Sequence, residues 1–293
     1  MTVLQAVVQG MIQGLTEFLP VSSSGHLALY QYFTGTGGES AALFSLVLHL
    51  GTLVAVFAAF WRTIAELIAE FFLSVGELLR GVNIFRDPPP RRRMIYLLVV
   101  SLVPLFLTLL VKDKMEAVAA DRSVVAEGIC FLITGTLLLL GDSCVGGRTR
   151  AGGMSYRAAL AVGLTQAVAP LPGISRSGST LSVGLILGLD RSYALTFSFL
   201  MGIPAVLGAL LLDLKEILGG GLGLPAGVVL AGLVTSALFG LLAIRMVRWL
   251  VATRHLRWFA FYTLILGLVV LVVGLIDTFA GYPVQNAVSA LLS

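Results

Sequence analysis

Apolar residues dominate this chain and gather in long runs separated by short polar segments. Six of the runs are long enough to cross about 30 Å of hydrocarbon as helices of roughly 20 residues. They lie near residues 41–60, 95–111, 123–141, 194–212, 224–244 and 258–277. Two further stretches, 3–35 and 158–190, are apolar at both ends but broken in the middle by Pro, Gly and Ser. Each of these predicts two half-helices that meet at a polar turn.

Composition agrees with this pattern. The chain has 293 residues, of which 58% are hydrophobic and 12% are charged, and its mean hydropathy is +0.99. A soluble core could not hide that much apolar surface, so we expect an all-α polytopic membrane protein with one integral membrane domain, 1–293. The N-terminus, MTVLQAVVQG, lacks the positive region of a removed signal peptide. Cys130 and Cys144 form no metal or redox motif and are interpreted as packing residues.

The arginines indicate topology. Segment 61–94 holds six of them and segment 245–257 holds four. Because cytoplasmic connections carry the excess of positive charge, both segments belong on one side. This requires that neither broken stretch crosses the membrane, so both are predicted to be re-entrant hairpins, with both termini outside. Lys112, Lys114, Arg122 and Lys215 then fall on the outer side. The arginines form no aromatic-studded basic stripe, which argues against a nucleic-acid partner.

The two broken stretches are related by a hidden duplication. A shift of 153 residues aligns them without a gap and gives ten identities over positions 6–45, among them Gln13 with Gln166, Ser22 with Ser175 and Ser24 with Ser177. The repeated unit is one hairpin followed by three spans, and three is odd, so the second copy should be inverted. We therefore expect a first repeat at 1–141 and a second at 158–277, whose polar turns converge on one chamber inside the membrane.

The second turn, PLPGISRSGST, has the residues of an anion site. Pro172 and Gly173 break the chain, and hydroxyl residues then lead into a half-helix whose N-terminus favours negative charge. Arg176 adds a planar fork of donors that matches phosphate oxygens. The alternative is an arginine that extends to the membrane surface. The flanking small and hydroxyl residues, Ser175, Ser177, Gly178, Ser179 and Thr180, favour oxyanion binding.

The first turn, IQGLTEFLPVSSSGH, supplies complementary groups. Gln13 and Glu17 share one helical face, and Ser22, Ser23 and Ser24 lead into His26. An ionisable residue inside a membrane is a functional candidate by default. His26 is able to pass a proton or accept a phosphoryl group near neutral pH. By contrast, His49 and His255 are interpreted as a packing and a surface residue. Together the two turns suggest phosphoryl transfer on a lipid phosphate.

These residues resemble a known family, the undecaprenyl pyrophosphate phosphatases or bacitracin-resistance proteins of bacteria. QGLTEFLPVSSSGH is similar to the family's (E/Q)xxxE signature with its Ser-rich continuation, and PGISRSGST to its PGxSRSxxT signature. The resemblance implies a multi-pass enzyme of the cytoplasmic (inner) membrane, opening on the periplasmic or outer face. Its reaction would be hydrolysis of undecaprenyl (C55 polyprenyl) diphosphate to undecaprenyl phosphate and inorganic phosphate, which recycles the lipid carrier for peptidoglycan synthesis.

The resemblance also assigns roles. Glu17, His26, Ser23 and Arg176 occupy catalytic positions, and a divalent cation, Mg²⁺ or Ca²⁺, would lie near Glu17. The expected substrate contacts are Gln13, Ser22, Ser24, Gly173, Ser175, Ser177, Gly178 and Thr180. Many members have Glu where this chain has Gln13, so Glu17 is the only acid of this motif. Whether His26, Ser23 or water attacks the phosphorus is left open, as is a homodimer. A polyprenyl-phosphate or anion transporter would explain the inverted repeat equally well.

Overall fold

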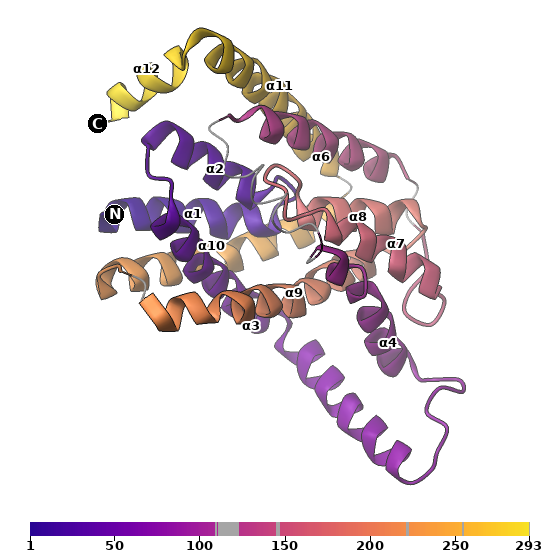
Figure 1. Ribbon diagram of the computed structural model, residues 1–293. Helices are drawn as coiled ribbons and strands as arrows, with labels where there is room; N and C mark the ends of the chain where they lie inside the picture. Colours follow the sequence, from indigo (N-terminus) through magenta and orange to yellow (C-terminus); the bar gives the residue numbers. More distant parts are fainter. Residues whose placement is uncertain (109, 111–122, 145–146, 221–222, 254, 293) are drawn as a thin grey trace.

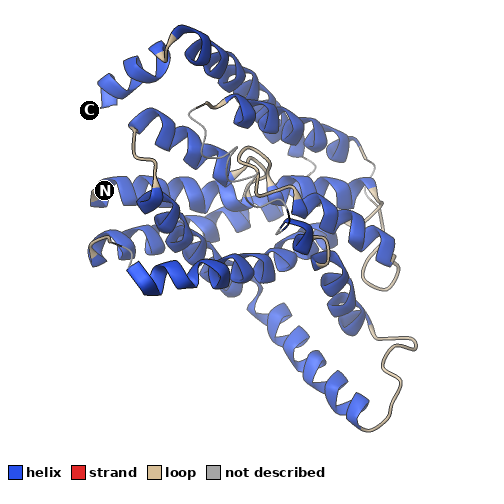
Figure 2. Cartoon of the chain, viewed as in Figure 1, coloured by secondary structure: helices blue, strands red, loops and turns tan. Residues whose placement is uncertain are grey.

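The computed structural model describes residues 1–108, 110, 123–144, 147–220, 223–253 and 255–292, and these form helices and loops without a strand (Figure 1, Figure 2). This confirms the predicted all-α class. The helices are α1 (Val3–Phe18), α2 (Ser23–Thr34), α3 (Glu39–Leu79), α4 (Pro90–Leu102), α6 (Val125–Ser143), α7 (Tyr156–Ala167), α8 (Arg176–Ile186), α9 (Arg191–Gly220), α10 (Ala226–Ala252), α11 (Leu256–Ala280) and α12 (Pro283–Leu292).

The first broken stretch is a helical hairpin made of α1 and α2. Thr2 begins α1 with a reciprocal cap, in which its hydroxyl accepts from the Gln5 backbone N–H and the Gln5 side chain accepts from the Thr2 N–H. α1 ends just before Pro20, which has no backbone N–H to continue the helix. The Ser22 hydroxyl then caps α2 by accepting from the Gly25 N–H.

The second broken stretch repeats this construction with α7 and α8. Ser155 caps α7, and Ser175 caps α8 by accepting from the Gly178 N–H at 3.1 Å. α7 starts at 156 and α1 at 3, and α8 starts at 176 and α2 at 23, so both pairs differ by 153 residues. Matching bounds and matching caps support the duplication. The opposite orientation of the two copies stays a prediction.

Each hairpin packs against long helices that belong to the other half of the chain. The first helix of each hairpin packs against the second long helix of the other half, α1 on α10 and α7 on α4. α1 is able to come close to α10 because Gly10 and Gly14 have no Cβ. A Cβ at either position would meet the backbone of α10. α6 packs on α11, and α3 crosses α9. The two hairpins are thereby held in the middle of the bundle.

Among the residues that the structure describes, five helices are long and apolar enough to cross a membrane, which makes this a multi-pass membrane protein. They cover 41–79, 125–143, 191–211, 226–252 and 256–280, and so include five of the six predicted spans. The sixth, 95–111, is interrupted because α4 ends at Leu102 and a turn at Val103 and Pro104 follows. The end of that span, Lys112, Lys114 and Arg122 lie outside the described residues, as does the side chain of Lys215. The sixth span therefore stays a prediction.

α3 is longer than its apolar run of 41–60 because it continues to Leu79 beyond a kink at Phe60. Acidic residues on this extension pair with arginines of α4, which compensates their charge. Arg92 contacts Glu70 at 2.8 Å and Glu77 at 2.7 Å, and Arg91 contacts Glu66 at 3.2 Å. Hydropathy alone detects the membrane part of such a helix and misses its extension.

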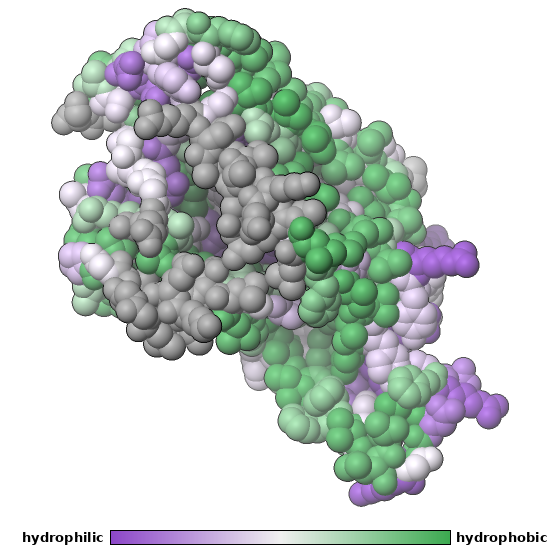
Figure 3. All heavy atoms as spheres, in the orientation of Figure 1, coloured by the Kyte–Doolittle hydropathy of each residue, from purple (hydrophilic) through white to green (hydrophobic). Residues whose placement is uncertain are grey.

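The arginine-rich segments gather at one end of the bundle, as the charge pattern predicts. Arg93 donates to the carbonyls of Ala151 and Met154, and Arg257 contacts Asp142 at 3.1 Å. Both chain termini lie at the opposite end (Figure 1). In the space-filling view, hydrophobic side chains cover much of the outer face of α6 and α11, and strongly hydrophilic ones collect at the tips beside α4 and α7 (Figure 3). The topology thus has one arginine-rich end and one end with both termini.

Candidate active site

The two polar turns interlock at the centre of the bundle, which confirms that they converge. The Ser22 hydroxyl accepts from the Gly173 N–H at 3.1 Å and donates to the Ile174 carbonyl at 3.2 Å. Thr134 of α6 holds the second turn from the other side, because its hydroxyl donates to the Gly173 carbonyl and accepts from the Ser175 N–H. The turns are therefore fixed by buried hydrogen bonds.

The backbone at this junction is unusual at two positions. Ser22 has φ 70°, a left-handed conformation that costs a non-glycine residue about 1–3 kcal/mol. Gly173 has φ 96°, and a Cβ there would meet the Glu127 carbonyl and Cys130 of α6. The hydrogen bonds of the Ser22 hydroxyl offset this strain. Ser22 thus holds the junction together, and the substrate contact expected of it stays a prediction.

Glu17 is the centre of a cluster of polar side chains from both turns. Its Oε1 accepts from Arg176 Nη2 at 2.5 Å, and its Oε2 accepts from the Ser23 hydroxyl at 2.6 Å. Gln13 Nε2 also donates to Oε2, at 3.0 Å. The Glu17 side chain is 7% exposed and that of Arg176 17%, so solvent screens this ion pair weakly. The first hairpin supplies the acid and the second its cation.

The guanidinium of Arg176 has a second amino group, Nη1, which does not contact Glu17. Its Nη1 is buried and has no hydrogen-bond partner among the described residues. It lies against Gly202 of α9, where a Cβ would overlap it. Gly202 therefore provides the space for the guanidinium. A buried donor without a partner is costly, which favours a ligand oxygen at this position when the site is filled.

A cavity of about 590 Å³ opens beside the cluster. At its polar end are Glu17, Ser23, Ser24, Arg176 and the Gln166 amide, whose two polar atoms have no partner among the described residues. Its flank is apolar, formed by the end of α4 and the chain beyond it (Leu102, Leu105, Phe106) and by residues 204–206 and 208–210 of α9. Such a cavity suits a ligand with a charged head and a hydrocarbon chain.

His49 also lines this cavity, although the sequence suggests a packing role. Its Nε2 lies 3.9 Å from Glu17 Oε2, and its Nδ1 lies 2.8 Å from the Ser45 carbonyl oxygen. The signal that could have found it is the one that found Glu17, an ionisable residue inside an apolar span. The span itself does not reveal which face of α3 meets the hairpins.

His26 has a different position from the one its sequence context suggests. Its Nδ1 lies 2.7 Å from the Ser22 carbonyl oxygen and its Nε2 lies 2.7 Å from the Tyr262 hydroxyl. The ring stacks on Tyr262 and meets the edge of Phe131, and His26 is not among the residues that line the cavity. The structure therefore brings Glu17, Ser23 and Arg176 together but holds His26 of α2 against α6 and α11.

The predicted anion site of the second turn is largely occupied by the protein's own bonds. The N–H groups of Gly173, Ser175 and Gly178 are engaged, and the Ser177 hydroxyl donates to the Leu19 carbonyl. The Thr180 hydroxyl bonds the Arg176 carbonyl and Ser198. The N–H groups of Arg176 and Ser177, in the first turn of α8, have no intrahelical acceptor. Ser175 lines the cavity, whereas Gly173, Ser177, Gly178 and Thr180 are not among the described residues that line it.

The donor set does not fit a resident divalent cation. Glu17 is the only carboxylate among the described residues that line the cavity, and both of its oxygens are engaged. The guanidinium beside it would repel a cation. In the part of the chain that the structure describes, no three His, Cys, Asp or Glu side chains form a group that could hold a metal. Glu17 thus has the partners of an ion pair and not those of a metal ligand.

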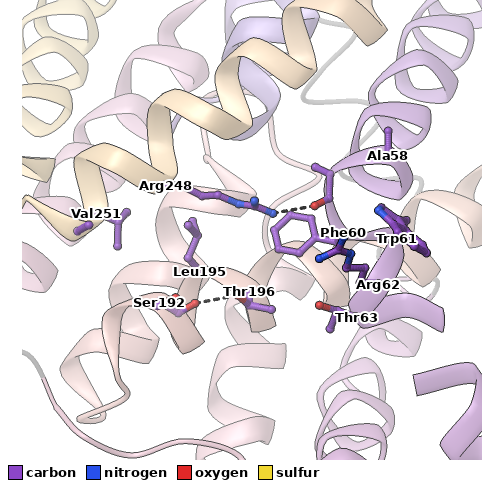
Figure 4. A pocket seen from close by; sticks show the side chains of 12 residues that line it. Ala58, Phe60, Trp61, Arg62, Thr63, Ser192, Leu195, Thr196, Arg248 and Val251 are labelled. Carbon is purple, nitrogen blue, oxygen red and sulfur yellow. Dashed lines mark hydrogen bonds between the residues drawn. The ribbon is translucent and has the colours of Figure 1, made fainter. Parts of the chain in front are cut away.

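A second cavity, of about 570 Å³, lies at the kink of α3 (Figure 4). Arg248 crosses it, with its guanidinium 4.2 Å from the Phe60 ring centroid and a hydrogen bond to the Ala59 carbonyl. Its described lining contains no carboxylate, no histidine and none of the residues singled out from the sequence. It lacks a proton-transfer group, so the cavity beside Glu17 is the candidate active site.

One family model and several curated relatives match nearly the whole chain. Residues 6–269 match the model described as bacitracin resistance protein BacA. The chain is 40% identical over 278 residues to the undecaprenyl-diphosphatase of Methanosphaera stadtmanae, covering 94% of this chain and 99% of the relative. It is 42% identical over 270 residues to the protein of that name from Rubrobacter xylanophilus, covering 91% and 96%. For Alkaliphilus metalliredigens the identity is 37% over 278 residues, covering 94% and 100%.

Proposed function

Because the chain belongs to the bacitracin resistance protein BacA family, we propose that it is an undecaprenyl-diphosphatase. The reaction hydrolyses undecaprenyl diphosphate to undecaprenyl phosphate and inorganic phosphate, which returns the lipid carrier to cell-wall synthesis. The observation that carries the proposal is the cluster of Glu17, Ser23 and Arg176 at the polar end of a cavity with an apolar flank. The diphosphate would occupy the polar end of the cavity, and the prenyl chain would extend from it along α4 and α9.

Ser23 is the nucleophile that the geometry favours. Its hydroxyl faces the cavity and already donates to Glu17 Oε2, which makes Glu17 the general base. His26 is a poorer candidate because its Nε2 is bonded to Tyr262 away from the cavity. We therefore assign His26 a positioning role, in which its Nδ1–H holds the Ser22 carbonyl and thereby the start of α2.

The reaction then has two steps. In the first, Ser23 Oγ attacks the terminal phosphorus and gives its proton to Glu17. The bond from that phosphorus to the bridging oxygen breaks, and the bridging oxygen stays on the lipid as undecaprenyl phosphate. In the second, water attacks the phosphoserine, Ser23 Oγ leaves and takes the proton back from Glu17, and inorganic phosphate is released. Arg176 lies where it would neutralise charge on the transferred group.

Protonation of Glu17 also affects Arg176. While Glu17 is ionised it holds Nη2 of the guanidinium, and only Nη1 lacks a partner. When Glu17 takes the serine proton, its attraction for the guanidinium weakens, so more of the arginine charge is available to the phosphoryl oxygens. Ser24, Ser175 and Gln166 line the same end of the cavity and are proposed to donate to the diphosphate. Gln13 keeps Glu17 in place.

A divalent cation is proposed to arrive with the substrate. Phosphate oxygens are preferred ligands of Mg²⁺, which keeps several of its waters and often binds proteins through few carboxylates. A Mg²⁺ or Ca²⁺ complex of the diphosphate fits a site that has an ion pair in place of a metal-binding cluster. Its contribution would be to neutralise the diphosphate charge before transfer.

The orientation is also part of the proposal. The cavity is lined by Leu46 and His49 of α3, by residues at and beyond the end of α4 (102, 105, 106 and 108) and by residues of α9 (204–206 and 208–210). The arginine contacts at the other end of the bundle involve residues 93, 151, 154 and 257. If the arginine-rich end faces the cytoplasm, the cavity opens toward the outer side. We accordingly propose the bacterial cytoplasmic membrane as the location, with a periplasmic or outer active site and both termini on that side.

Phosphate release from purified protein tests the proposed function. Detergent-solubilised protein is incubated with undecaprenyl diphosphate and Mg²⁺, beside Ser23→Ala and the distant control Ser289→Ala. We expect the wild type and the control to release phosphate and Ser23→Ala to release almost none. Binding of the lipid without phosphate release would contradict the proposal and favour a carrier.

A further inference from the structure

We propose that His49 is the general base of the second step, accepting a proton from the water that attacks the phosphoserine. The inference rests on the proposed function and adds to it a residue outside both polar turns. His49 lines the same cavity as Ser23 and lies 3.9 Å from Glu17, measured from Nε2 to Oε2. It belongs to α3, the helix that follows the first hairpin.

The orientation of the imidazole is fixed by its other nitrogen. Nδ1 lies 2.8 Å from the carbonyl oxygen of Ser45, and a carbonyl can only accept, so Nδ1 carries the hydrogen. In the neutral ring the lone pair is then on Nε2, the nitrogen beside Glu17. A histidine held by a backbone carbonyl and directed into a cavity has the form of a general base.

The second step needs a proton acceptor other than Glu17. After the first step Glu17 holds the serine proton, which has to return to Ser23 Oγ as that oxygen leaves. A proton from the attacking water therefore needs another destination. Among the described residues that line the cavity, the ionisable ones are Glu17, His49 and Arg176, and a guanidinium cannot accept a proton. His49 is the group that remains.

The repeat gives independent support for this position. A shift of 153 residues takes His49 to Gly202, and both contact the ion pair. Gly202 of α9 lies against the guanidinium of Arg176, while His49 of α3 lies beside the carboxylate of Glu17. Equivalent levels of two equivalent helices thus flank the site. Gly202 leaves space for the arginine side chain, and His49 places a base beside the carboxylate.

The water oxygen bonds to phosphorus, the bond from phosphorus to Ser23 Oγ breaks, Glu17 returns its proton to Oγ, and Nε2 of His49 takes the water proton. The imidazolium then gives this proton to solvent as phosphate leaves. A His49 that only kept Glu17 in position would slow both steps, whereas a base for water slows the second alone.

Rapid-quench kinetics with substrate labelled in the terminal phosphate separates these roles. We expect His49→Ala to transfer the labelled phosphoryl group from the lipid to the protein in the first turnover within about threefold of the wild-type rate, to accumulate acid-trapped phosphoenzyme, and to release phosphate about 10²- to 10³-fold more slowly. His49→Gln should behave in the same way, because an amide is not a base. Added imidazole should restore phosphate release to His49→Ala. His255→Ala, which alters a histidine stacked on Trp249 outside the cavity, serves as the control.

Three results would overturn the inference. Equal slowing of both steps would make His49 a positioning residue for Glu17, and normal phosphate release in both His49 variants would remove it from the reaction. A wild-type enzyme that releases phosphate without a first-turnover phosphoenzyme would exclude the two-step route. A wild-type protein that releases no phosphate at all contradicts the proposed function itself, so the two failures are distinguishable.

Discussion

Replacing Arg176 with lysine tests the role of the second polar turn. In the wild type, Nη2 binds Glu17 at 2.5 Å while Nη1 is buried without a partner among the described residues. One guanidinium is therefore able to hold the carboxylate and a phosphoryl oxygen together. A lysine ammonium is a compact charge on a flexible stem and does not reproduce this planar fork. The variant keeps the charge and loses the second contact.

The magnitude follows from the loss of one charge-assisted hydrogen bond in the transition state. Such a bond contributes about 1.5–3 kcal/mol. At about 1.36 kcal/mol for each factor of ten, Arg176→Lys should lower kcat/KM by about 10- to 150-fold. The loss should fall mainly on kcat, because the apolar flank of the cavity still binds the prenyl chain.

Steady-state phosphate release in detergent micelles, at several lipid concentrations, measures this effect. Arg248→Lys is the matched control, since Arg248 lies over Phe60 in the other cavity. A thermal melt of each variant checks that folding is intact. If Arg176→Lys has kcat/KM within twofold of the wild type, the guanidinium does not make the two contacts proposed for it.

Three further predictions address the neighbouring residues and the cation. Gly202→Ala places a methyl group where the Arg176 guanidinium lies, so phosphate release should fall at least tenfold with little change in Tm. Gly227→Ala, in α10 away from the cavity and with open space around its Cβ, should be active, and a fully active Gly202→Ala would contradict the packing described. His26→Ala should lower kcat by about 3- to 10-fold through loss of the hydrogen bond to the Ser22 carbonyl. His26→Asn keeps a donor at that position and should recover most of the lost kcat. If a kinetic assay shows equal loss of kcat in both variants, the ring instead transfers a proton. Mg²⁺ or EDTA without lipid should leave Tm unchanged within about 1 °C. A ligand raises Tm only when it binds the folded protein, and the lipid-free site is proposed to bind no metal. A large metal-induced shift in Tm would reveal a resident metal site.

The hairpins are the part of the fold that the sequence predicts well. Pro20 and Pro172 break the chain, and Ser22 and Ser175 supply helix caps whose effect is local, so a reader of the sequence can place α2 and α8. Proline is less decisive inside a span. Pro104 interrupts the predicted span 95–111, whereas Pro204 lies within the continuous helix α9. Neighbouring helices decide between these outcomes, and their positions are not encoded locally.

The candidate site also contains residues that the sequence identifies and residues that only the structure identifies. Glu17, Ser23 and Arg176 are recognisable because they are polar residues at breaks in apolar stretches. The role of His49 is not recognisable in this way, because it depends on which face of α3 meets the first hairpin. The surroundings of His26 include Tyr262, a residue 236 positions away that no local pattern connects to it. Composition and motifs therefore identify the candidates, and only tertiary packing decides which of them share a cavity.

Peptide mapping of a quenched reaction tests the central claim most directly. Purified wild-type protein is mixed with undecaprenyl diphosphate labelled in the terminal phosphate, stopped within one turnover, digested and analysed by mass spectrometry. The account predicts label on Ser23, in the peptide that follows Pro20, and none in Ser23→Ala or Glu17→Gln. Label on His26, or rapid phosphate release with no labelled serine at any time, would contradict it.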